Sequence, residues 1–169
     1  MRKVKIGLVG LGRLGEQHAI NIATKIMNAE LTALCDINKE KLNEVSDKLG
    51  VKYRFSDFDE MIKQNELDAI FIASPSGLHA LHIEKALDTG KHVFSEKPLG
   101  VTIEECLRAE KAVERHHEKV CMLGFMRRFD DSYKYAKAKV DAGEIGRPIL
   151  FRSYTQDPIR FIEGAIAFA

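Results

Sequence analysis

Short apolar runs alternate with longer amphipathic stretches from the start of the chain to about residue 123. The run at residues 4–9 is apolar and is followed by Gly10, which predicts a strand buried on both faces of a parallel sheet. From Arg13 onward, apolar residues recur every three or four positions and predict a helix with one apolar stripe. This strand and this helix begin a repeating series.

The alternation continues with a strand predicted at residues 31–35 and a helix that Asn38 caps and that extends to Leu49. Later strands are expected at residues 69–73, 92–94 and 120–123, and we number them as the fourth, fifth and sixth. A third strand is expected before them, but the pattern does not give its boundaries. Helix signals between them are Ser76 as a cap, Gly90 as an end, and Thr102 with Glu105 as a capping box. Such βαβ units indicate an α/β fold, a Rossmann-type doubly wound parallel sheet over residues 1–123, with ligands at the carboxyl ends of its strands.

The pattern changes at Gly124. A charged stretch at residues 130–142 predicts a helix, and turn residues at 143–148 precede an alternating strand expected at 149–155. The apolar residues from Phe161 predict a further helix that the end of the chain interrupts. We therefore interpret residues 124–169 as the incomplete beginning of a second, α+β domain.

Composition narrows the class of protein. Of 169 residues, 45% are hydrophobic and 30% charged, which is typical of a folded globular chain. The net charge of +1 provides no basic surface for nucleic acid, and no apolar run approaches the roughly 18 residues of a membrane span. The three cysteines, Cys35, Cys106 and Cys121, are widely spaced and lack a CxxC pair, which argues against a disulfide framework or a zinc site. We expect a cytoplasmic protein with a small-molecule ligand, no nucleic-acid or membrane partner, and no metal.

A GxGxxG pattern lies between the first predicted strand and helix. Gly10 permits a tight turn, Gly12 lets a pyrophosphate approach the backbone, and Gly15 allows the helix to pack closely on the strand. Arg13 and Leu14 complete the predicted loop, and the helix amino terminus favours a phosphate through its free N–H groups and its dipole. The pattern indicates a dinucleotide site, although a methyltransferase also has a glycine loop and an acid.

Asp36 stands 21 residues after Gly15, at the end of the second predicted strand. A carboxylate there can accept hydrogen bonds from both ribose hydroxyls, and its charge would repel a 2′-phosphate. NAD is therefore favoured over NADP as the cofactor. Lys39 offers an ammonium that could reach such a phosphate, but a solvated lysine on the helix is the favoured alternative. For Asp36 the alternative is an ordinary helix-start residue, although Asn38 already provides that cap.

Polar residues also follow the fourth and fifth predicted strands, at the sheet edge where a nicotinamide would lie. The runs are Ser74-Pro75 with His79, and residues 90–98 with Glu96-Lys97-Pro98. Together with the glycine loop and residues 124–129, they resemble the Gfo/Idh/MocA oxidoreductases over essentially the whole chain. Within that family, residues 124–130, 143–149 and 152–154 are most similar to the members that oxidise inositols.

The resemblance implies a nucleotide-binding domain followed by a larger, mainly antiparallel domain that carries the substrate pocket and the oligomer contacts of a homo-oligomer. It also implies NAD-dependent oxidation of a ring hydroxyl of a cyclitol or sugar to a ketone. Lys97 matches the lysine beside the nicotinamide, where it would hydrogen-bond the reacting hydroxyl and stabilise the developing alkoxide. Family members usually hold the bond matching Lys97-Pro98 in the cis form.

Further site residues follow from the same resemblance. We expect Ser74, Pro75 and His79 to flank the nicotinamide ribose and the pyrophosphate, although a lone histidine on a helix is more often structural. Glu96 would orient Lys97 or meet the cofactor ribose, with a solvated glutamate as the alternative. Arg127, Gln156 and Asp157 are expected to join Lys97 in binding substrate.

The family's remaining proton relay, a histidine and an aspartate, is expected just beyond the position of Ala169. His79, His82 and His92 do not replace that histidine, because they lie in other elements or on the cofactor side. We therefore expect this chain to bind NAD but to be nearly inactive alone, since a general base contributes roughly 10² to 10⁴ in rate. The alternatives are a non-catalytic dinucleotide sensor or interaction module, and a dehydrogenase of another sugar.

Overall fold

The computed structural model describes residues 2–154 and 156. The chain divides into two compact units, Met1–Gly124 and Phe125–Ala169. The first unit contains an all-parallel six-stranded sheet in the order β3-β2-β1-β4-β5-β6. Its strands are β1 Val4–Val9, β2 Ala29–Cys35, β3 Tyr53–Phe55, β4 Ala69–Ile72, β5 His92–Glu96 and β6 Cys121–Gly124. The strand order reverses between β1 and β4, so the sheet has its topological switch point there, as in a Rossmann fold.

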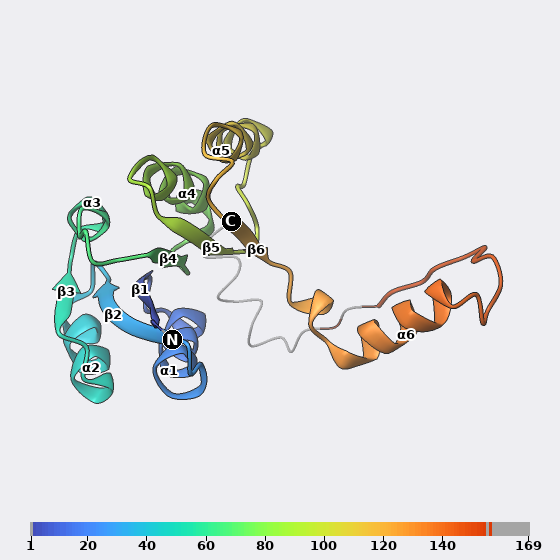
Figure 1. The fold of residues 1–169 in the computed structure, drawn as a ribbon, viewed down its shortest axis with the longest axis horizontal. Helices are drawn as coiled ribbons and strands as arrows, with labels where there is room; N and C mark the ends of the chain where they lie inside the picture. Colours follow the sequence, from blue (N-terminus) through green and yellow to red (C-terminus); the bar gives the residue numbers. More distant parts are fainter. Residues whose placement is uncertain (1, 155, 157–169) are drawn as a thin grey trace. The chain divides into compact units, whose positions relative to one another are not determined.

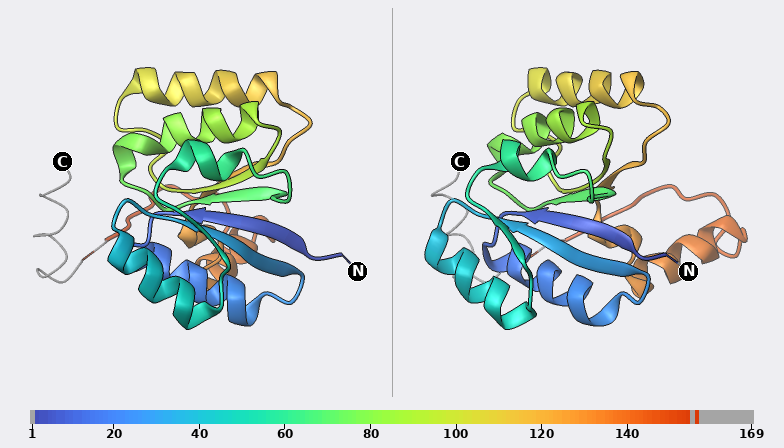
Figure 2. Two further views of the ribbon diagram at one scale, coloured as in Figure 1. Left: turned by 90° about the vertical axis from the view of Figure 1, so that its left-hand side faces the viewer. Right: turned by 60° about the vertical axis from the view of Figure 1, so that its left-hand side comes forward.

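Helices cover both faces of this sheet (Figures 1 and 2). The helices are α1 Arg13–Lys25, α2 Lys39–Leu49, α3 Phe58–Ile62, α4 His79–Asp88 and α5 Ile103–Arg115, with the 3-10 helix η1 Ser76–Leu78 before α4. Helices α1 and α2 pack on one face, and α3, α4 and α5 pack on the other. This arrangement is expected for right-handed βαβ crossovers that continue outward from the switch point in both directions.

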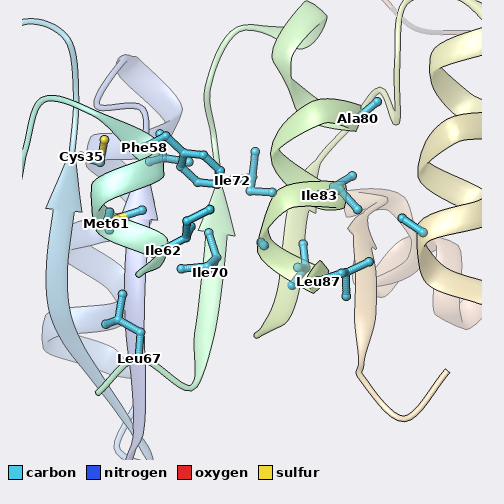
Figure 3. Packing of buried hydrophobic residues seen from close by; sticks show 14 of the residues in the cluster. Cys35, Phe58, Met61, Ile62, Leu67, Ile70, Ile72, Ala80, Ile83 and Leu87 are labelled. Carbon is cyan, nitrogen blue, oxygen red and sulfur yellow. The ribbon is translucent and has the colours of Figure 1, made fainter. Parts of the chain in front are cut away.

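Alternation along the strands divides the core into two layers. Ile70 and Ile72 of β4 are fully buried beneath α3 and α4, whereas Phe71 between them packs toward the layer beneath α1 and α2. Figure 3 shows the first layer, where Met61 from α3 and Ile83 from α4 meet the sheet. Burial of these side chains on both faces explains why the strands are almost continuously apolar in sequence.

The doubly wound parallel fold predicted from the sequence is confirmed, with differences at three elements. β3 and α3 received no boundaries, because each is short. Ser76 does not cap α4: the Leu78 N–H donates to Pro75 O at 2.8 Å and closes a 3-10 turn first, so the helix begins at His79 without a side-chain cap. The capping box of Thr102 and Glu105 is confirmed at α5.

In the second unit, the structure describes the 3-10 helix η2 Met126–Arg128 and the helix α6 Asp131–Asp141, capped by Asp130. The strand expected at residues 149–155 is not formed over 149–154, and residue 155 lies outside the described residues. A strand needs a neighbouring strand for its backbone hydrogen bonds, and the described part of this unit provides none. The helix expected from Phe161 also lies outside the described residues. Among the helices described, none is long and apolar enough to cross a membrane.

Candidate functional site

The three glycines of the loop after β1 have different surroundings. Gly10 has a φ of +91°, and a Cβ there would overlap the carbonyl oxygen of Ala73. A Cβ on Gly15 would overlap the carbonyl oxygen of Gly10, so this glycine allows α1 to approach the loop. Gly12 differs, because a Cβ there would meet no atom within 4 Å. Two glycines are thus required by the fold, and Gly12 leaves space that a ligand can fill.

The amino terminus of α1 opens onto this space. Gly12 is the N-cap residue and has no side chain to satisfy the first N–H groups of the helix. Arg13 and Leu14 follow in the first turn, and both are exposed. Free N–H groups and the positive end of the helix dipole together bind a phosphate well. The loop therefore has the shape and the polarity that a pyrophosphate needs.

Asp36 lies beside the loop, directly after β2. Its Oδ2 accepts a hydrogen bond from the Leu11 N–H at 2.6 Å, and its Oδ1 accepts one from the Asn38 N–H at 2.8 Å. Asn38 itself caps α2 by accepting from the Lys41 N–H, so Asp36 is not the helix cap. A carboxylate has about four acceptor positions, and two of them remain for ribose hydroxyls.

His79 is buried, with 2% of its surface exposed, and it connects two loops at the carboxyl edge of the sheet. Its Nε2 lies 2.7 Å from the Ser74 carbonyl oxygen and its Nδ1 lies 2.7 Å from the Pro98 carbonyl oxygen. Carbonyl oxygens only accept hydrogen bonds, so both contacts are hydrogen bonds when both ring nitrogens carry a proton. The imidazole thus holds the backbone after β4 to the backbone after β5.

His82 holds the side chain of the same serine. Its Nδ1 lies 3.0 Å from Ser74 Oγ, and its ring stacks on Phe58 at a centroid distance of 4.0 Å. Burial, followed by the nearby charges of Lys85 and His79, lowers the pKa of His82 to about 4. The ring is therefore neutral near pH 7, and its Nδ1 shares a hydrogen bond with the Ser74 hydroxyl. Pro75, the next residue, is exposed at this edge.

Lys97 is exposed at the end of β5, and its peptide bond to Pro98 is cis, as the resemblance implies. Its Nζ forms no hydrogen bond or ion pair with any residue that the structure describes, so it is available to a ligand. Glu96 does not contact that ammonium: its Oε2 accepts from the Lys97 backbone N–H at 3.3 Å. The other oxygen, Oε1, lies 2.9 Å from His18 Nε2 on α1.

His18 was missed in the sequence analysis. It lies three residues after Gly15 and four before Ile22, two of the residues that α1 buries against the sheet. Its ring stands 4.6 Å from the ring of Phe71, measured between centroids. The helical spacing therefore contained a signal that places His18 over the sheet, although no local pattern pointed to Glu96 as its partner.

Three residues of the second unit, Arg127, Gln156 and Asp157, are expected to bind substrate, and the structure describes the first two. Arg127 forms an ion pair with Asp130 at 3.1 Å and lies over the ring of Tyr133. Gln156 is exposed outside any helix or strand, and Asp157 lies outside the described residues. Their contacts with substrate stay predictions. Among the described residues, no cluster of three or more His, Cys, Asp or Glu side chains is placed to hold a metal ion.

Comparison with known proteins agrees with this geometry. A family model described as an oxidoreductase family with an NAD-binding Rossmann fold matches residues 4–125. The scyllo-inositol 2-dehydrogenase (NAD(+)) of Bacillus subtilis is 38% identical over 165 residues, which are 95% of this chain and 48% of that protein. The inositol 2-dehydrogenase of Salmonella typhimurium is 32% identical over 148 residues, 87% of this chain and 44% of that protein.

Solved structures give the same result. The scyllo-inositol dehydrogenase of Lactobacillus casei, determined with bound NAD(H) and scyllo-inositol, is 49% identical with a TM-score of 0.93 and matches 99% of this chain and 49% of its own. The myo-inositol 2-dehydrogenase of Lactobacillus plantarum is 38% identical with a TM-score of 0.94, again over 99% and 49%. The chain thus spans about half the length of these relatives. The glycine loop, Asp36 and Lys97 all lie within the residues that the family model matches.

Proposed function

Because the chain belongs to the Gfo/Idh/MocA oxidoreductases, a family with an NAD-binding Rossmann fold, we propose that it is the cofactor-binding part of an NAD-dependent dehydrogenase. The reaction is oxidation of a ring hydroxyl of a cyclitol, of the inositol class, to a ketone. The observation that carries the proposal is the open space at Gly12, the N-cap of α1, in a loop that the Leu11 N–H ties to the carboxylate of Asp36. The similarity to inositol dehydrogenases over almost the whole chain supports the substrate class.

The residues present fit NAD. The uncapped start of α1 would hold the pyrophosphate, and Asp36 would accept hydrogen bonds from the adenosine ribose with its two remaining acceptor positions. The same carboxylate disfavours a 2′-phosphate by charge repulsion, so NAD is preferred over NADP. Ser74, Pro75 and Glu96 lie at the edge where the nicotinamide half would be held.

Lys97 would act on the substrate. When bound, NAD supplies a hydride acceptor at the carboxyl edge of the sheet. The Lys97 ammonium would donate a hydrogen bond to the reacting hydroxyl oxygen and stabilise the negative charge that develops there as the hydroxyl proton passes to a general base. An exposed ammonium without a partner among the described residues is suited to this role, because it gives up no existing ion pair when substrate arrives.

A full-length homo-oligomer is proposed from the family resemblance alone. A cytoplasmic location is proposed from the state of the cysteines. Cys35, Cys106 and Cys121 are all free. Burial raises the pKa of the Cys35 thiol to about 12, which leaves it protonated and unreactive. A chain with three free thiols suits a reducing compartment.

Mapping NAD binding on the isotope-labelled chain tests the proposal. We expect NAD to shift the backbone amide signals of residues 11–15, Asp36 and Lys97, and the chain alone to show little or no oxidation of scyllo-inositol. Shifts confined to residues outside this edge of the sheet, or no shifts at millimolar NAD, would refute the cofactor assignment.

A further inference from the structure

Lys97 lies between two residues that histidines hold from opposite faces of the sheet. His18 comes from α1, and its Nε2 lies 2.9 Å from Oε1 of Glu96. His79 comes from α4, and its Nδ1 lies 2.7 Å from the carbonyl oxygen of Pro98. The helices α1 and α4 pack in the two separate core layers, so the two histidines reach the same three-residue segment from both sides.

The side chain of Lys97 has no comparable support. Its Nζ has no partner among the described residues, and a lysine side chain has four rotatable bonds. The space that the ammonium can reach is therefore determined by where its own backbone is held. That backbone is fastened at Glu96, which also accepts from the Lys97 N–H at 3.3 Å, and at Pro98.

The two contacts differ in kind. His79 is almost fully buried and bridges two carbonyl oxygens, those of Ser74 and Pro98, so it also fixes the distance between the loops after β4 and β5. His18 is only partly buried, and its polar contact among the described residues is with one carboxylate, that of Glu96. A side chain with one hydrogen-bond donor can replace His18, whereas replacing His79 requires two donors that point in opposite directions.

We propose that His18 and His79 are positioning residues that hold the segment Glu96–Pro98 from the two faces of the sheet and so set the geometry of the nicotinamide side of the site. The inference rests on the proposed function, because it assigns the segment to the nicotinamide half of the cofactor. It predicts that loss of either histidine weakens recognition of that half and leaves recognition of the adenosine diphosphate half intact.

Two probes separate the halves of the site. NADH contains both halves of the cofactor, and ADP has only the adenosine and the pyrophosphate. We expect the unaltered chain to bind both, and NADH more tightly. His18→Leu should weaken NADH binding about fivefold, the effect of losing about one hydrogen bond, and His79→Leu at least as much. Each variant should change ADP binding by less than about twofold.

Conservative variants separate a positioning role from a general loss of stability, because only a positioning role predicts that NADH affinity recovers when the hydrogen-bond donor is restored. The amide N–H of His18→Gln can donate to Glu96, so this variant should recover NADH affinity. His79→Gln can donate to only one of its two carbonyl oxygens at the required distance, so this variant should stay weak. The matched control is His116→Leu, because His116 Nε2 also hydrogen-bonds a carboxylate, Asp88 Oδ1 at 2.8 Å, but does not contact residues 96–98.

Thermal melts identify any variant that fails to fold, and the partly exposed His18 gives a test that does not depend on replacing a buried ring. If the unaltered chain binds neither NADH nor ADP, the proposed function fails and the inference fails with it. If it binds both and the folded His18→Leu keeps the NADH to ADP affinity ratio, the proposed function stands and the positioning role is refuted. The role is also refuted if His116→Leu lowers that ratio equally.

Discussion

The Leu11 N–H donates a hydrogen bond of 2.6 Å to Oδ2 of Asp36, across 25 residues of chain. This bond joins the glycine loop after β1 to the acid after β2. The second carboxylate oxygen accepts from the Asn38 N–H and so also joins the acid to the start of α2. The glycine loop and the acid, which are 25 residues apart in sequence, are therefore fixed to each other by the protein's own hydrogen bonds.

Replacing this acid should change cofactor choice. Asp36→Asn removes the charge that disfavours a 2′-phosphate and one of the acceptors for the ribose. We expect NADH affinity to fall about tenfold or more, NADPH affinity to fall less, and stability to decrease by about 1 kcal/mol, since the amide NH₂ cannot accept from both backbone groups. Fluorescence titration and urea unfolding measure these changes.

Asp57→Asn is the control for that variant. Oδ1 of Asp57 accepts from the Asp59 N–H at 2.9 Å, the same local bond that Asp36 makes with Asn38. Asp57 caps α3, however, and does not bond to the glycine loop. The Asp57→Asn variant should lower stability slightly and leave the affinities for NADH and NADPH unchanged. Equal losses of cofactor affinity in the two variants would contradict the role assigned to Asp36.

Two alanine substitutions in the glycine loop should have opposite profiles. Gly12→Ala places its Cβ in open space at a φ of −63°, which alanine adopts readily, so the fold should keep its stability while NADH binding weakens at least about tenfold. Gly15→Ala overlaps the backbone of Gly10 and should lower the free energy of unfolding by about 3 kcal/mol. Denaturant melts and NADH titrations of both variants distinguish these outcomes, and a stable Gly15→Ala variant would contradict the packing role of that glycine.

His82 should make stability depend on pH. The unfolded chain takes up a proton at this ring near pH 6.5, whereas the folded chain does so only near pH 4, because burial and the charges of Lys85 and His79 outweigh the opposing charge of Asp59. Between these pH values the unfolded state binds more protons than the folded state. The contribution of His82 to the free energy of unfolding is therefore fully present above about pH 6.5, and up to about 3 kcal/mol of it is lost as the pH falls.

The measurement is the free energy of unfolding in urea at a series of pH values. His82→Asn keeps a hydrogen-bonding group for the Ser74 hydroxyl but does not titrate. Its stability should vary less with pH over this window than that of the unaltered chain. Identical pH dependence of the two proteins would show that His82 is not the group responsible.

Lys97 and Lys91 should differ as a functional and a structural lysine. Lys97→Ala should change stability by less than about 0.5 kcal/mol and, in a full-length enzyme that contains this chain, reduce turnover about 100-fold or more. Lys91 is buried, its Nζ donates to the Gln64 carbonyl oxygen at 2.9 Å, and burial lowers its pKa. Lys91→Ala should cost about 1 to 3 kcal/mol of stability. A similar loss of stability in Lys97→Ala would contradict its assignment as a free ammonium.

The parts of the fold that were predictable carry local signals. The glycine loop, the Asn38 cap and the capping box at Thr102 are each encoded within a few residues, and β1 and β2 are apolar because helices cover both faces of the sheet. Asp36 was predictable as a site residue because it follows a buried strand at a fixed distance from the loop.

The unpredicted features depend on distant partners. His18 and Glu96 are 78 residues apart, and no pattern within either segment encodes their contact. The buried ring of His79 likewise contacts the carbonyl oxygen of Pro98, 19 residues away on another loop. Residues 149–154 have a local pattern that predicts a strand, yet no strand forms there. The described residues provide no neighbouring strand for this segment to pair with.

We propose that this chain holds NAD through the open glycine loop and Asp36. The decisive experiment is to titrate the chain with NADH and with NADPH and to follow the fluorescence of the bound dihydronicotinamide. We predict saturable binding of NADH and binding of NADPH that is weaker by about tenfold or more. Tighter binding of NADPH, or no binding of either dinucleotide, would show that the glycine loop and Asp36 do not form an NAD site.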